Sequence, residues 1–214
     1  MGKELYLLDR IISGFSFIQY VTTVLFALIR GTYYILYYRI TRKNVRIGFP
    51  FKAFAKVIIK GPGKVIIEKH CVAAENVFTG LTIVTFNPKS FLRIGQRSVI
   101  GGTTICCRNK IIIENDVMSA NSLIQDTLFL DNKFSKLDLL KDTMDDQIPI
   151  VVGKNAWIGG NCIILEGTTV GKDCVIGAGS VAWQTTLPDY SLGNGNLIKR
   201  GMSIIRILSL MGAN

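Results

Sequence analysis

The side chains that can move protons near neutral pH are few in this chain. His70 is its single histidine and lies in the stretch IIEKHCV. Asp126 and Asp131 lie in SLIQDTLFLDN, among apolar residues that would raise a carboxyl pKa if they buried it. His70, Asp126 and Asp131 are therefore the candidate general bases, and an aspartate could instead orient the histidine. A surface histidine with no catalytic role is the alternative for His70.

The cysteines show no ligand spacing. Five are present, an odd number, and Cys106 and Cys107 are adjacent. We expect free thiols in a reducing cytosol. A single histidine also excludes a multi-histidine metal site within one chain, so no metal is predicted.

A period of six residues organises the region from Val152 to Val181. It reads VGKNAW, IGGNCI, ILEGTT, VGKDCV, IGAGSV, with an aliphatic residue opening every group. This is not a helical period, and it predicts a solenoid of short parallel strands with the aliphatic residues inside. Three flat sides make a coil of 18 residues, which is the spacing of Gly153 from Gly171 and of Gly159 from Gly177.

The same period is present earlier in the chain. Hexads run from Ile94 to Ile111 and resume at Ile113 after a slip of one residue. The solenoid is therefore expected from about Val45 to about Val181. One long loop, 125–150, breaks the rhythm and carries six aspartates, and a loop of this length inside a compact fold is usually functional.

The first 43 residues differ from the rest in charge and hydropathy. Ile11–Ile29 carries no charge, and tyrosines and arginines follow it, as at a membrane interface. The net charge is +10, and no acid occurs from Arg10 through Ile67. These features predict a helical segment, 1–43, that lies on or spans a membrane at the cytoplasmic face of the inner (plasma) membrane. The alternative is a core or oligomer-interface helix, and nucleic acid is not predicted because no recognition motif is present.

The run NAWIGGNCIILEGTTVGKDCVIGAGSV, followed by LPDYSLGNGNLIKR, resembles the C-terminal signature of the hexapeptide-repeat acyltransferases. The opening IGFPFKAFAKVIIKGPGKVIIEKHCV looks like the branch that O-acetylates sugars of bacterial surface polysaccharides. The resemblance covers about Val45 to Arg200. It implies a mainly β fold, a left-handed parallel β-helix over 44–200 with a C-terminal tail, 201–214. It also implies a homotrimer that uses acetyl-CoA or another acyl-CoA.

The resemblance also implies cofactor-binding residues. Trp157 matches an aromatic beside the cofactor channel, and Gly159, Gly177 and Ala178 would allow close backbone approach to pantetheine. Lys199 and Arg200 would hold CoA phosphates. Each residue has a structural alternative: a subunit contact for Trp157, coil corners for Gly159, Gly177 and Ala178, and a solvated end for Lys199 and Arg200.

Two departures from the family pattern leave two functions open. The family's GNPA is GNGN here, Gly193–Asn196, and the stretch 122–132 lacks the usual loop histidine. The first function is an acyl-CoA-dependent O-acyltransferase acting on a sugar hydroxyl of a surface polysaccharide or a lipid-linked glycan precursor. The second is a catalytically degenerate, membrane-bound trimeric scaffold. A γ-type carbonic anhydrase is excluded because its zinc needs more histidines than the chain has.

Overall fold

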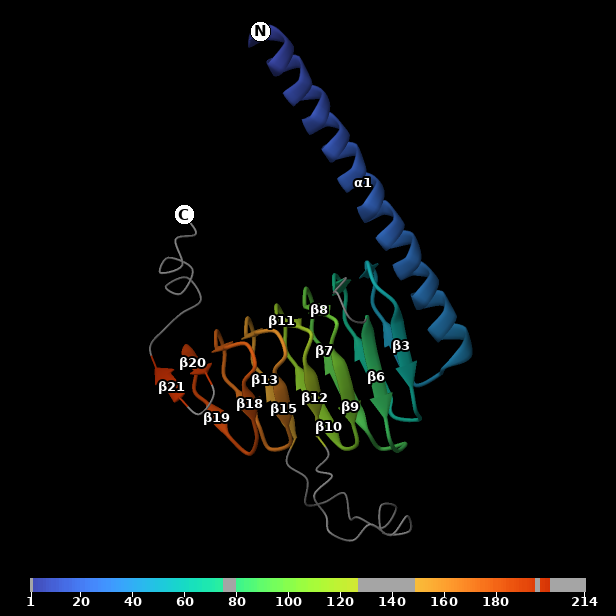
Figure 1. Cartoon of the computed structure of the whole chain (residues 1–214). Coiled ribbons are helices and arrows are strands. Elements are labelled where there is room, and N and C mark those ends of the chain that lie inside the picture. Colours follow the sequence, from blue (N-terminus) through green and yellow to red (C-terminus); the bar gives the residue numbers. More distant parts are fainter. Residues whose placement is uncertain (1, 75–79, 127–148, 195–196, 201–214) are drawn as a thin grey trace.

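The protein is one long helix followed by a three-sided stack of short strands (Figure 1). The structure is a computed structural model that describes residues 2–74, 80–126, 149–194 and 197–200. Side chains are described over 17–74, 80–126 and 149–193. The helix α1 spans Gly2–Thr41.

Three sheets form the sides of the stack, and we name them A, B and C. Sheet A contains, in spatial order, β1 (Val45–Ile47), β4 (Lys64–Ile67), β7 (Phe91–Ile94), β10 (Lys110–Ile113), β13 (Ile150–Val152), β16 (Thr169–Val170) and β19 (Thr186–Leu187). Sheet B contains β2 (Lys52–Ala53), β5 (Val72–Ala74), β8 (Val99–Gly101), β11 (Met118–Ala120), β14 (Trp157–Ile158), β17 (Val175–Ile176), β20 (Ser191–Asn194) and β21 (Leu197–Arg200). Sheet C contains β18 (Val181–Ala182), β15 (Ile163–Leu165), β12 (Leu123–Gln125), β9 (Thr104–Cys107), β6 (Leu81–Thr85) and β3 (Val57–Lys60).

Successive strands along the chain enter sheets A, B and C in turn, so each coil lies on the coil before it. Trp157 pairs in parallel with Val175, and Ile163 with Val181, which is the predicted 18-residue repeat. Val99 pairs with Met118, one residue longer, as the slip near Ile113 predicted. The parallel β-helix is confirmed, and its arrangement is consistent with the left-handed form. Among the strands that the structure describes, only β21 runs antiparallel, folding back on β20.

The core is a set of stacked aliphatic columns inside the prism. In sheet C, Ile83, Ile105, Ile124 and Ile164 lie above one another in register, and all four are fully buried. A β-branched side chain in such a column packs on identical neighbours above and below. Burying each one contributes on the order of 1.5–3 kcal/mol.

The C-terminal half of α1 covers the first coil, whose strands would otherwise leave backbone groups unpaired. Tyr38 Oη accepts a hydrogen bond from Ile59 N at 2.8 Å and donates to Val57 O at 3.3 Å. A Cβ at Gly31 would lie 1.8 Å from Phe51 O, so glycine permits the close approach of the helix. The helix thus caps the solenoid, as repeat folds require.

The described part of α1 that precedes this cap extends away from the β-helix (Figure 1). Its large apolar side chains are exposed, among them Phe17, Ile18, Val21, Leu25 and Phe26. Within the described residues, no helix combines the length and hydropathy needed to cross a bilayer.

We predict that Tyr38→Phe lowers the free energy of unfolding by about 1–3 kcal/mol, because it leaves the buried Ile59 N–H without its acceptor. Chemical denaturation of both proteins measures the difference. Tyr33→Phe is the matched control, since Tyr33 is exposed on the same helix. An unchanged midpoint for Tyr38→Phe would show that the cap does not depend on this bond.

Candidate active site

The corner between sheets B and C is built from residues of repeating type. One position has positive φ in four successive coils and is occupied by Gly102, Asn121, Asn161 and Gly179. Glycine and asparagine are the residues that adopt this conformation at least cost. The position after it points inward and is small and buried, as in Ser122 and Cys162. The turn therefore takes the chain from one sheet to the next within two residues in the coils of Gly102 and Asn121, and within four in the coils of Asn161 and Gly179.

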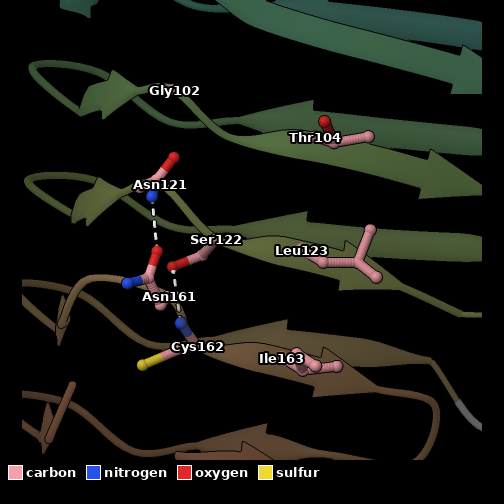
Figure 2. A pocket seen from close by; sticks show the side chains of 8 residues that line it. All are labelled: Gly102, Thr104, Asn121, Ser122, Leu123, Asn161, Cys162 and Ile163. Carbon is pink, nitrogen blue, oxygen red and sulfur yellow. Dashed lines mark hydrogen bonds between the residues drawn. The ribbon is translucent and has the colours of Figure 1, made fainter. Parts of the chain in front are cut away.

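An open groove of about 410 Å³ runs over this corner (Figure 2). Its lining comes from three successive coils: Gly102, Thr104, Asn121, Ser122, Leu123, Asn161, Cys162 and Ile163. Asn121 Nδ2 donates to Asn161 Oδ1, so the two amides form a ladder along the corner. Ser122 Oγ donates to Gly159 O at 3.1 Å and accepts from Cys162 N at 3.3 Å, which ties neighbouring coils together.

The groove offers hydrogen bonding without a general base. Asparagine amides and the Thr104 hydroxyl can bind polar groups of a ligand. Its lining contains neither an imidazole nor a carboxylate. Burial raises the pKa of the Cys162 thiol, and Sγ donates to Gly177 O at 3.2 Å, so this thiol is not an activated nucleophile. A proton acceptor must therefore come from elsewhere.

Four of the predicted cofactor residues lie together at the end of sheet B and in the turn that follows it. Trp157 is half-buried in β14, in register between Met118 and Val175. A Cβ on Gly159 would lie 2.7 Å from Ala178 N, so coil stacking alone requires glycine there. Ala178 itself is exposed one coil on, beside Gly177. The structure thus brings Trp157, Gly159, Gly177 and Ala178 onto two neighbouring coils.

His70 lies at a different corner, between sheets A and B. It has a φ of 63°, is exposed, and its backbone N–H donates to Pro50 O at 2.7 Å. The same corner carries a positive φ at Arg97 and Asp116 in later coils, and those two side chains pair at 2.6 and 2.7 Å. Within one protomer, His70 does not line the groove.

Asp126 directly follows β12 and points into the corner of the coil before it. Its Oδ1 accepts from Arg108 N at 2.6 Å and its Oδ2 from Asn109 N at 2.9 Å. The residue is fully buried. Burial raises the pKa of Asp126, while the hydrogen bonds from backbone amides oppose that rise. This geometry favours a carboxylate that holds a turn over one that takes a proton from a substrate.

Three other predicted residues cannot be placed at the groove. Asp131 lies outside the described residues. Lys199 and Arg200 are in β21, where they pair with Leu192 and Ser191, and their side chains also lie outside the described part. In the described part of the chain, no cluster of three or more His, Cys, Asp or Glu could hold a metal ion.

The groove residues Asn121, Asn161 and Thr104 were not predicted. A signal for the asparagines does exist: each precedes a small residue at the same place in its coil, in ANS and GNC. This signal is hard to see in the sequence because the long loop separates the two coils, so the two asparagines are not 18 residues apart.

We predict that Asp126→Asn lowers the free energy of unfolding by about 1–3 kcal/mol, because the new amide NH₂ would face a backbone N–H donor. Thermal and denaturant midpoints measure this loss. A catalytic base would behave differently: the variant would keep its stability and lose only acyl transfer, and that outcome would contradict the structural role.

Three comparisons place the chain among known proteins. Residues 149–181 match the family model described as bacterial transferase hexapeptide (six repeats). Over 51 residues the chain is 47% identical to a protein named an acetyltransferase in Staphylococcus aureus strain COL, a segment covering 24% of this chain and 25% of that protein. A protein named an acetyltransferase in Mycobacterium tuberculosis is 31% identical over 109 residues, covering 49% of this chain and 34% of that one. The chain thus spans from a quarter to about a third of these curated relatives' lengths.

The fold also has a solved counterpart. The crystal structure of the polySia specific acetyltransferase NeuO aligns with a TM-score of 0.51 at 22% identity, covering 74% of this chain and 72% of that one. At this identity the likeness concerns the fold. The chain therefore carries the hexapeptide repeat of bacterial transferases over residues 149–181, and its three-sided stack of parallel strands has the fold of that acetyltransferase structure.

Proposed function

We propose that this protein is an acyl-CoA-dependent O-acyltransferase, with acetyl-CoA as the expected donor. The acceptor is a sugar hydroxyl of a surface polysaccharide or of a lipid-linked glycan precursor. One observation carries the proposal: the residues that match the transferase repeats, 149–181, include Trp157, Gly159, Gly177 and Ala178, and these lie on two neighbouring coils at or just before the corner that the polar groove crosses. A thin pantetheine arm fits a surface of this kind, with few side chains and an aromatic wall.

The reaction needs a base that this groove does not contain. The acceptor oxygen attacks the thioester carbonyl and its proton passes to the base; the C–S bond then breaks, and the base returns the proton to the CoA sulfur, so that CoA leaves as a thiol. His70 is exposed, so its ring is accessible to a neighbouring copy of the chain. We propose that His70 of one protomer, or Asp131, serves a groove formed between protomers.

Assembly into a homotrimer is supported by an apolar strip on sheet C. Leu123, Ile163 and Val181 point outward in register on three successive coils, and Ile163 and Val181 are exposed together with Trp183. An exposed apolar strip of this kind is typical of a protein–protein contact. It adjoins the groove, so a partner seated on it would wall the site.

Membrane contact through residues 1–43, at the cytoplasmic face of the inner membrane, is part of the same proposal. Its support is the exposed apolar surface of α1 next to a stretch rich in cations. Such contact would hold the groove near a lipid-linked acceptor.

The first test is calorimetry with acetyl-CoA together with an assay for free thiol in the presence of glycan acceptors. We expect Trp157→Ala to weaken acetyl-CoA binding about tenfold through lost contact area with the cofactor. Phe86→Ala is the control, since Phe86 is an exposed aromatic outside the groove. Absence of acetyl-CoA binding to the intact protein would overturn the proposal.

A separate test concerns the assembly. We expect Val181→Asp to lower the molar mass measured by light scattering from that of a trimer to that of a monomer, because it places a charge in the apolar strip. Thr186→Asp, at an exposed position of sheet A, should leave the molar mass unchanged. A trimer that survives Val181→Asp would place the interface elsewhere.

A scaffold without catalysis is the second candidate. It is favoured by the missing histidine in 122–132 and by the groove lining, which holds no base. Acetyl-CoA binding without acceptor-dependent thiol release would fit it, whereas thiol release that depends on an acceptor would refute it.

A further inference from the structure

A second pocket lies where α1 ends and the first coil begins, away from the groove. Its volume is about 430 Å³. Four cationic and three aliphatic residues line it: Arg39, Arg42, Lys43, Arg46, Ile35, Val45 and Ile47. No acidic residue lines the pocket, so no lining residue neutralises its positive charge.

The cations of this pocket are available to a ligand. Arg42 Nη1 donates a hydrogen bond to Gly61 O at 3.1 Å. Among the described residues, Arg39, Lys43 and Arg46 make no ion pair and are exposed. Glu68 is the first acidic residue after this stretch. It forms an ion pair with Arg93, whose Nη2 lies 2.7 Å from Glu68 Oε1.

The local electrostatics favour an anion with oxygen acceptors. The C-terminus of α1 contributes about half a negative charge at most, which four cations outweigh. Arginine presents a planar fork of donors that matches phosphate oxygens two at a time. Four like charges around one cavity therefore attract a phosphate group.

The aliphatic part of the pocket indicates that the phosphate is attached to an apolar body. Val45 is buried, and Ile35 and Ile47 pack on the core of the β-helix. On the neighbouring face of α1, an exposed stripe recurs at spacings of three and four: Phe26, Ile29, Tyr33, Leu36 and Ile40. These spacings place the five side chains in one line that runs toward the pocket.

We propose that this pocket binds the phosphate of an anionic lipid, with the lipid's apolar part against the α1 stripe. The proposal rests on the membrane contact proposed for residues 1–43, and it is independent of acyl transfer. The pocket turns a general attraction between a basic segment and a membrane into a defined headgroup site. Lipid binding in this pocket would also set the orientation of the β-helix relative to the bilayer, because the pocket lies where α1 meets the first coil.

The test is co-sedimentation of the full chain with vesicles. One set contains phosphatidylcholine alone, and the other contains equal parts of phosphatidylcholine and phosphatidylglycerol. We expect binding to the second set, and roughly 30-fold weaker binding for the double variant Arg39→Gln with Arg46→Gln. Both side chains are exposed and unpaired among the described residues, so thermal midpoints should stay unchanged.

The matched control is Lys56→Gln with Lys60→Gln, which removes the same charge from exposed positions of the first coil outside the pocket. Equal losses in the two double variants would overturn the site in favour of diffuse attraction. Equal binding of the intact protein to both vesicle sets would overturn the requirement for an anionic headgroup, because phosphatidylcholine carries a phosphate but no net charge. Saturable binding of inorganic phosphate, without binding to the anionic vesicles, would overturn the lipid as its source. Acyl transfer that persists in the variants that no longer bind vesicles would leave the enzyme proposal standing.

Discussion

Parallel strand pairing joins each coil of the solenoid to the coils before and after it, and this constraint shapes the rest of the molecule. Each coil must return the chain to the same three sides at the spacing of parallel strands, about 4.8 Å. The turns between sheets A and B therefore have no more than four residues in which to change direction. Positive φ at matching corner positions is the consequence, and at the corner between sheets A and B it recurs at His70, Arg97, Asp116, Asn155, Asp173 and Tyr190.

The same constraint decides what the polar and sulfur side chains do. Corners admit only small residues on the inside, which explains the buried positions of Cys71, Cys162 and Cys174. Burial raises the pKa of Cys71 to about 11, so its thiol is unreactive at neutral pH. Asp126 completes a turn in the same way, through backbone amides. Residues that suggest chemistry in the sequence are thus used here to stack coils.

The ends of the stack have a different problem, because an open coil exposes unpaired strand edges. At the N-terminal end, α1 solves it with polar groups as well as apolar area: Tyr34 Oη accepts from Val57 N at 3.1 Å, and Arg30 donates to Phe54 O at 2.6 Å. The cap uses only the C-terminal half of the helix. The exposed apolar side chains before the cap and the basic pocket at the end of α1 are features that capping the solenoid does not require.

The sequence by itself determined the architecture, because the buried aliphatic residues and the corner residues must recur at the period of the coil. From this period followed the three-sided parallel stack, the coil of 18 residues and the one-residue slip. The helical first segment followed from its hydropathy and charge, and the resemblance to the hexapeptide-repeat acyltransferases pointed to Trp157 and Gly159. Periodicity reports only which residues are equivalent from coil to coil. Only the tertiary structure decided which corner each residue occupies, and so separated His70 from the groove, buried Asp126, aligned Asn121 with Asn161 across a long loop, and placed four cations of the stretch 39–46 around one pocket where the helix meets the first coil.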